Sequence, residues 1–114
     1  MRRFTKDGSP SEHHEQVSFI RWARMWLPDE LRPLIFAIPN GGKRNIITAI
    51  RLREEGVEAG IPDIFFAWPR LGYHGLFIEM KKAKGGAPTP HQAAMIDRLK
   101  KAGYFAGICH AAVS

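Results

Sequence analysis

Apolar residues recur at helical spacing near the beginning of the chain. The apolar members of this stripe are Phe19, Ile20, Ala23, Trp26 and Leu27, and the polar residues Glu12 and Gln16 extend it at its N-terminal end. Three- and four-residue spacing predicts an amphipathic helix, which must end before Pro28. Ser9 is a candidate N-cap, and Pro10 fits the first helical position. We therefore expect a flexible polar tail over residues 1–8 and one domain over residues 9–114.

Short apolar runs separated by turn residues fill the rest of the chain. The elements expected there are a strand at residues 34–38, a helix at 46–55, strands at 63–68 and 76–81, a helix ending near 102, and a strand at 104–109. Asn45 is a candidate cap for the second helix, and Thr89 followed by proline opens the third. The expected order is α-β-α-β-β-α-β, and the second and third strands together are expected to form a β-hairpin across residues 63–81. This order favours an α/β fold with a mixed sheet flanked by helices.

The composition narrows the classes of protein that remain. The 114 residues are 45% hydrophobic, which suits one folded domain. Lys and Arg number 17 against 11 acidic residues, so the net charge of +6 favours a polyanionic partner. One cysteine excludes an internal disulfide framework and a cysteine-based zinc site. Neither a signal peptide nor a membrane-length apolar run is recognisable, so we expect a cytoplasmic protein without membrane contact.

Three charged residues interrupt the two apolar strands of the expected hairpin. Glu79 and Lys81 share one strand face, because side chains alternate along a strand. In a hairpin, the start of the first strand lies beside the end of the second, which brings Asp63 near both. Two carboxylates favour Mg²⁺ or Mn²⁺, and a lysine can hold water or a scissile phosphate. The alternative interpretation is an ion pair between Lys81 and one carboxylate, of structural value only.

Five blocks in a fixed order resemble a known family. They are Glu12-His13-His14-Glu15-Gln16, Pro39-Asn40-Gly41-Gly42, Gly60-Ile61-Pro62-Asp63, Glu79-Met80-Lys81 and Thr89-Pro90-His91-Gln92. This pattern is similar to the VRR-NUC family, the virus-type replication and repair nucleases of the PD-(D/E)XK superfamily. The resemblance implies a restriction-endonuclease-like α-β-β-β-α-β core, a divalent metal ion and the cleavage of DNA. It also implies the cytoplasm of a bacterial or phage-infected cell.

The resemblance assigns roles to individual positions of the two strands and the first helix. Asp63 and Glu79 match metal ligands, and Lys81 matches the catalytic lysine. The backbone carbonyl of Met80 is expected to complete the metal shell. Glu12 matches a helix glutamate that reaches the metal directly or through water. Glu15 competes for that last role, but at about 100° per residue Glu12 lies nearer the middle of the apolar stripe.

Two of these positions have alternative interpretations that local chemistry supports. Glu12 would also close a capping box with Ser9. Gln92 matches the family's helix-opening glutamine, which contacts the site or the substrate, and Thr89-x-x-Gln92 is equally a capping box. Both alternatives stay open at the level of the sequence.

Basic and glycine-rich loops are the expected DNA contacts. The residues concerned are Asn40, Gly41, Gly42, Lys43 and Arg44 in one loop, and Lys82 and Lys84 in the other. The first loop lacks the glycine spacing and the Ser or Thr of a phosphate-binding Walker loop. The tryptophans Trp22, Trp26 and Trp68 are expected in the core rather than stacked on bases. The five histidines show no metal-ligand spacing.

These observations predict a metal-dependent DNA endonuclease without a small-molecule cofactor. The resemblance implies a homodimer and a structure-selective activity on branched, Holliday-junction-like DNA, in replication, recombination or repair. A basic nucleic-acid-binding protein without turnover is the alternative from another class. A restriction-like or nicking nuclease acting on linear duplex is the alternative enzyme.

Overall fold

The computed structural model describes residues 12–39, 45–82 and 86–110. Its elements are α1 (Glu12–Trp26), a short 3-10 helix (Arg32–Leu34), β1 (Ile35–Ala37), α2 (Ile46–Glu54), β2 (Ile64–Phe66), β3 (Leu76–Lys81), α3 (Pro90–Lys101) and β4 (Phe105–His110). The expected order of helices and strands is confirmed, with the 3-10 helix added before β1. The expected tail at residues 1–8 and the Ser9 cap lie outside the described residues.

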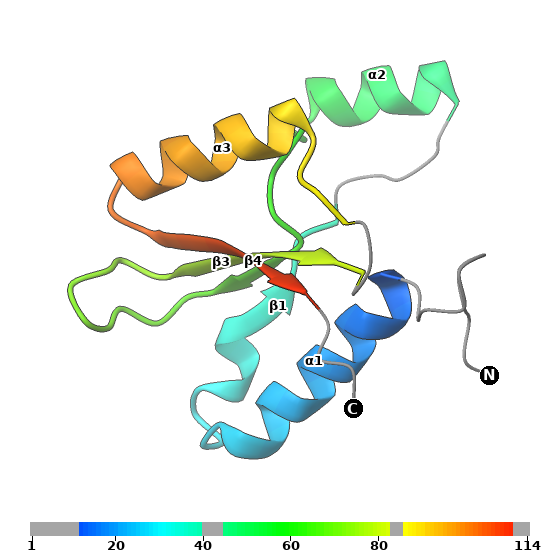
Figure 1. Cartoon of the computed structure of the whole chain (residues 1–114). Coiled ribbons are helices and arrows are strands. Elements are labelled where there is room, and N and C mark those ends of the chain that lie inside the picture. The colour runs from blue at the N-terminus through cyan, green and yellow to red at the C-terminus, as the bar shows by residue number, and fades with distance from the viewer. Residues whose placement is uncertain (1–11, 40–44, 83–85, 111–114) are drawn as a thin grey trace.

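The four strands form one mixed sheet in the order β1-β2-β3-β4. Strand β2 pairs antiparallel with both β1 and β3. Strands β3 and β4 are parallel, and helix α3 forms the crossover connection between them. Figure 1 shows α1 on one face of this sheet and α3 on the other, with α2 set beyond α3. The α/β fold with helices flanking a mixed sheet is therefore confirmed.

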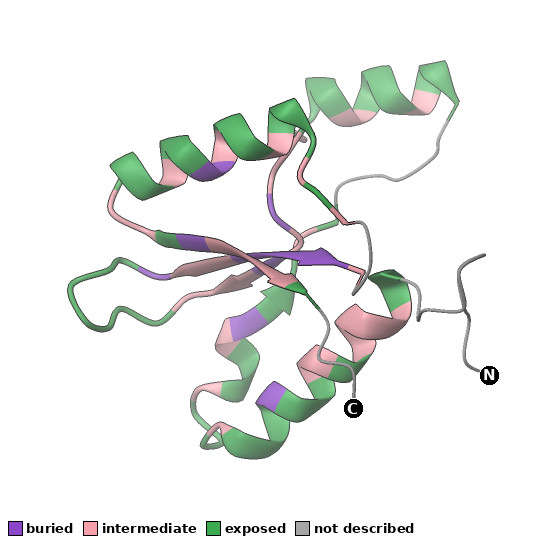
Figure 2. Ribbon diagram, in the orientation of Figure 1, coloured by how far each residue is buried: buried purple, intermediate pink, exposed green. Residues whose placement is uncertain are grey.

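The main core lies between α1 and the sheet. Its buried members are Ala23, Ile35, Ile64, Ile78 and Met80, and Figure 2 shows the purple segments that they contribute. Because side chains alternate along β3, Phe77 points instead to the α3 face, where its ring centroid lies 4.4 Å from that of Phe65. Glu79 and Lys81 continue that α3-facing row at the end of the strand, so the alternation of β3 determines which face carries the charges.

The tryptophans do not occupy the core positions expected for them. Trp26 is 73% exposed and Trp22 is 58% exposed, and Trp68 beyond β2 is also exposed. Ala23 and Leu27 pack against the sheet. Trp26 lies about 60° around the helix from Ala23, so its side chain does not pack in the core between α1 and the sheet. The stripe that packs on the sheet is therefore narrower than the sequence pattern suggested.

Helices α2 and α3 begin at the residues expected from their N-caps. Asn45 caps α2 by accepting a hydrogen bond from the backbone N–H of Thr48 at 2.8 Å. Thr89 caps α3, and Pro90 is the first helical residue. Of the described helices, none combines the length and the apolarity that crossing a bilayer requires.

Candidate active site

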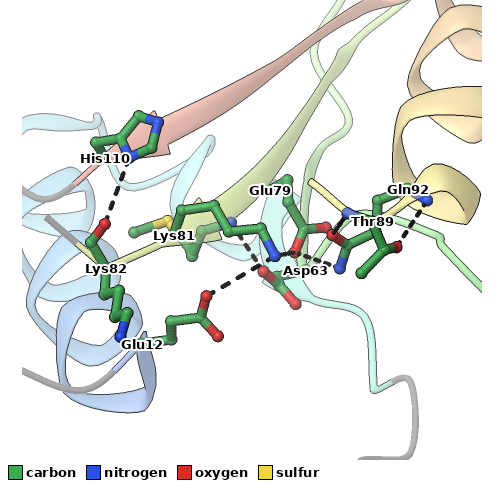
Figure 3. A network of polar contacts seen from close by, with 9 residues as sticks. Glu12, Asp63, Glu79, Lys81, Lys82, Thr89, Gln92 and His110 are labelled. Atoms are coloured by element: carbon green, nitrogen blue, oxygen red, sulfur yellow. Dashed lines mark hydrogen bonds and ion pairs between the residues drawn. The ribbon is translucent and has the colours of Figure 1, made fainter. Parts of the chain in front are cut away.

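The β2–β3 hairpin brings Asp63 beside the end of β3. Ile64 pairs with Ile78 across the antiparallel ladder, so Asp63, one residue before β2, stands opposite Glu79. Asp63 Oδ2 accepts a hydrogen bond from the backbone N–H of Met80 at 2.8 Å. Figure 3 shows the carboxylates and the lysine gathered at this end of the sheet. The cross-strand register therefore brings Asp63 close to Glu79, as the expected hairpin predicted.

Glu79 is a buried carboxyl group with an incomplete set of partners. Its Oε1 accepts a hydrogen bond from Gln92 Nε2 at 3.2 Å. Its Oε2 is buried and has no hydrogen-bond partner among the described residues. Burial is the largest cause that raises the pKa of Glu79, and together with the adjacent Asp63 carboxylate it brings this pKa to about 8. The Lys81 ammonium opposes the rise without overcoming it.

Lys81 lies between carboxylates that come from two different elements. Its Nζ is 3.9 Å from Glu79 Oε1 and 3.8 Å from Glu12 Oε1. Both distances exceed those of ordinary hydrogen bonds. Lys81 therefore attracts each carboxylate by its charge but forms a hydrogen bond with neither. The Lys81 side chain is only 9% exposed. Because neither carboxylate accepts a hydrogen bond from it, the Lys81 ammonium can donate to an oxygen of water or of a bound substrate.

The structure separates the two candidate glutamates of α1. Glu12, on the first turn, has its carboxylate within 4 Å of Lys81 Nζ. Glu15 acts on a different neighbour: after burial, its charge is the second cause that raises the pKa of the Cys109 thiol on β4. Glu12 is thus the glutamate that faces the lysine, and its role toward a metal stays a prediction.

Gln92 combines both interpretations that the sequence left open. Its Oε1 accepts from the backbone N–H of Thr89 at 2.9 Å, and its backbone N–H donates to Thr89 Oγ1 at 3.2 Å. These two bonds complete the capping box. The remaining donor, Nε2, reaches Glu79. One side chain therefore begins α3 and connects that helix to the candidate site.

Gly60 is a part of the site whose purpose the sequence did not reveal. Its φ of +80° is in the left-handed region, and a Cβ built there would lie 2.5 Å from the backbone oxygen of His91. The loop before Asp63 thus packs directly on the first turn of α3. The glycine of the Gly-Ile-Pro-Asp block was the only sign in the sequence of a close backbone contact. The sequence could not show that the contact is with His91, because His91 belongs to α3.

The donors at this end of the sheet fit a hard divalent cation. Among the described residues, no three His, Cys, Asp or Glu side chains come together as a complete metal cage. Mg²⁺ commonly uses one or two carboxylates and leaves its other positions to water and phosphate oxygens. The Asp63 and Glu79 carboxylates, with the unpartnered Oε2 of Glu79, meet that requirement.

The predicted DNA contacts are described only in part. Lys82 follows β3 directly, is half-buried, and has its backbone oxygen 3.4 Å from His110 Nδ1. Lys84 and the loop of residues 40–44 lie outside the described residues. The structure therefore supplies a position for Lys82 at the candidate site, while the contacts to DNA stay predictions.

Comparisons with known proteins agree with this geometry. The model of the VRR-NUC domain family matches residues 9–113. A solved structure described as a "VRR_NUC domain protein" is similar to this chain with a TM-score of 0.77 and 30% sequence identity. That similarity covers 89% of this chain and 78% of the other. A search of curated proteins found no match.

Proposed function

The chain belongs to the VRR-NUC domain family, a nuclease family, and on this premise we propose that it hydrolyses DNA phosphodiester bonds with Mg²⁺ or Mn²⁺. One observation carries the metal dependence: a buried Glu79 oxygen without a partner stands beside a second carboxylate. Like charges this close disfavour ionisation unless a cation joins them. A divalent ion bound by both carboxylates would allow both of them to be ionised.

Four residues would hold the ion, and Lys81 would act on the water or the substrate beside it. The Asp63 and Glu79 carboxylates and the Met80 carbonyl would be direct ligands, with Glu12 acting directly or through water. When bound, the ion lowers the pKa of water and neutralises charge on a phosphoryl oxygen. Lys81 would orient the attacking water or the scissile phosphate with its free donors. Gln92 would keep Glu79 turned toward the ion through the bond at 3.2 Å.

We extend the proposal to the shape of the substrate and to the assembly. A homodimer acting on branched, Holliday-junction-like DNA would present two catalytic centres to a twofold-symmetric substrate. Replication, recombination and repair are the processes in which such branches arise. Light scattering during size-exclusion chromatography measures the assembly, and matched four-way, flap and linear DNAs measure the preference. A monomer with equal rates on all three would contradict this extension.

The geometry disfavours a binding protein in which these charges serve stability alone. A buried ion pair stabilises a fold only when its geometry is good and its polar atoms are satisfied. Here both contacts of Lys81 are 3.8 Å or longer, and one Glu79 oxygen has no described partner. A restriction-like nuclease on linear duplex has the same catalytic residues, so the substrate comparison above separates it.

Asp63→Asn is the decisive test of the proposed function. The amide oxygen can still accept the Met80 N–H, so folding and DNA binding should persist while the metal loses a charged ligand. We expect cleavage to fall at least about a hundredfold.

Asp97→Asn is the matched control, because it removes the same charge from an exposed position on α3. Cleavage rate, metal affinity and melting temperature should be measured on all three proteins. Wild-type cleavage by Asp63→Asn, with purified protein, would overturn the assignment.

A further inference from the structure

The surface of α1 contains a hollow of about 300 Å³ outside the carboxylate site. Its lining residues are His13, Gln16, Val17, Ile20, Arg21 and Arg24. We call this surface the α1 groove. No catalytic, metal-binding or DNA-binding role proposed above involves any of these residues.

The α1 groove begins at the catalytic end of the molecule. His13 follows Glu12, whose carboxylate is 3.8 Å from Lys81 Nζ, and Figure 1 shows the first turn of α1 beside the end of β3. From His13 to Arg24 the helix rises about 17 Å at 1.5 Å per residue. A strand leaving the candidate site along α1 would therefore meet the groove at once.

The lining combines positive charge with an aliphatic surface. Arg21 and Arg24 supply two guanidinium groups, and no carboxylate belongs to the described lining. Arg24 donates one hydrogen bond to the backbone oxygen of Ile35 at 3.1 Å, which orients it while other donors of its fork remain. Val17 and Ile20 are half-buried between these polar groups. The charge therefore fits an anionic chain, and the aliphatic part fits its apolar portions.

We propose that the α1 groove binds a single-stranded segment of the DNA substrate that extends from the cleavage site; this inference rests on the proposed function. Single strands bind through basic grooves that follow the phosphates and apolar surfaces that cover unpaired bases. A duplex hides the faces of its bases, so Val17 and Ile20 would gain little from it. At 3.4 Å per nucleotide in a stacked strand, the helix segment that carries the lining residues is about as long as five nucleotides.

Binding should be tested with the non-cleaving Asp63→Asn protein as the common background. The probes are a labelled ten-nucleotide single strand, a blunt duplex, and the same duplex with a single-stranded tail. Arg21→Gln should weaken binding of the single strand and of the tailed duplex about tenfold, and leave the blunt duplex nearly unchanged. Arg53→Gln on α2 is the matched control, because it removes the same charge from an exposed helical position.

A second variant tests the groove without removing an arginine. Val17→Glu places a carboxylate between the guanidinium groups and should weaken single-strand binding at least as much as Arg21→Gln. Melting temperatures establish that each variant is folded. If Val17→Glu does not fold, Val17→Gln tests the same position without the charge, and it should weaken single-strand binding by a smaller factor.

Two results would overturn the inference. Unchanged single-strand binding in the folded Arg21→Gln protein would show that the groove is not used. An equal loss on the blunt duplex would show that the arginine contacts double-stranded DNA. Either result leaves the proposed function standing, because that function depends on the cleavage by wild-type and Asp63→Asn proteins and not on binding by the groove.

Discussion

Glu79 makes the stability of the metal-free protein depend on pH. Its pKa rises from 4.5 to about 8 in the folded state, chiefly through burial. Between these values the folded protein binds one proton more than the unfolded chain, so the free energy of unfolding falls as pH rises. We expect the melting temperature in chelator to fall by several degrees between about pH 5 and about pH 8.

Glu79→Gln isolates this contribution from other titrating groups. Glutamine keeps the shape and stays neutral, so the decline in melting temperature over that pH range should become shallower. Adding Mg²⁺ to the wild-type protein at the upper end of the range should raise the melting temperature, because a ligand of the folded state stabilises it. Parallel pH curves for both metal-free proteins would refute this account.

Lys81 is expected to serve the reaction rather than the binding of the ion. Lys81→Ala removes a cation that competes for Glu79 and Glu12, so metal affinity should persist or increase. Cleavage should nevertheless fall about a hundredfold or more, because the charge that orients water or phosphate is gone. Lys100→Ala is the control, because it removes the same charge from the end of α3, away from the candidate site. Calorimetric metal titration and cleavage rates measure the two effects, and full activity in Lys81→Ala would remove its catalytic role.

At the scale of elements, the site depends on how the loop before β2 packs on α3. Gly60→Ala would force a Cβ against the backbone of His91 and displace the first turn that carries Gln92. We expect cleavage to fall about tenfold, as when supporting contacts of a metal ligand are lost.

Gly72→Ala separates this displacement from backbone strain. Gly72 has a similar φ of +83°, but no described atom lies within 4 Å of the Cβ built there. Both variants should lose about 1–2 kcal/mol of stability from the left-handed conformation. Rates are to be compared well below both melting temperatures. Equal cleavage by the two variants would mean that the Gly60 contact does not position the site.

At the scale of the whole molecule, the net charge of +6 predicts strong dependence of DNA binding on salt. Affinity of the Asp63→Asn protein should fall at least about tenfold between roughly 50 and 200 mM salt. Replacing Lys82 and Lys84 by alanine should lower the slope of log affinity against log salt by about two.

The matched control replaces Lys100 and Lys101, which lie at the end of α3 away from the candidate site. That pair carries the same charge and should leave the slope nearly unchanged. Fluorescence anisotropy over a salt series measures all three proteins. An unchanged slope after loss of Lys82 and Lys84 would direct attention to the basic loop at residues 40–44.

Most elements were predictable because their causes are local. The cap at Asn45 and the capping box of Thr89 and Gln92 use partners three residues away, so the sequence alone contains both halves of each interaction. Alternation along β3 likewise placed Glu79 and Lys81 on one face. The hairpin then made the approach of Asp63 predictable, because antiparallel pairing relates its position to theirs.

The sequence by itself thus determined the order of elements, the starts of α2 and α3, and the face that Glu79 and Lys81 share, all of which follow from periodicity and short-range bonds. Only the tertiary structure decided which glutamate of α1 faces Lys81, that Gln92 also reaches Glu79, and that Trp26 stands outside the core. These outcomes depend on the angle and depth at which helices pack on the sheet. Such packing joins residues far apart in the chain, and a local pattern specifies only one side of each contact.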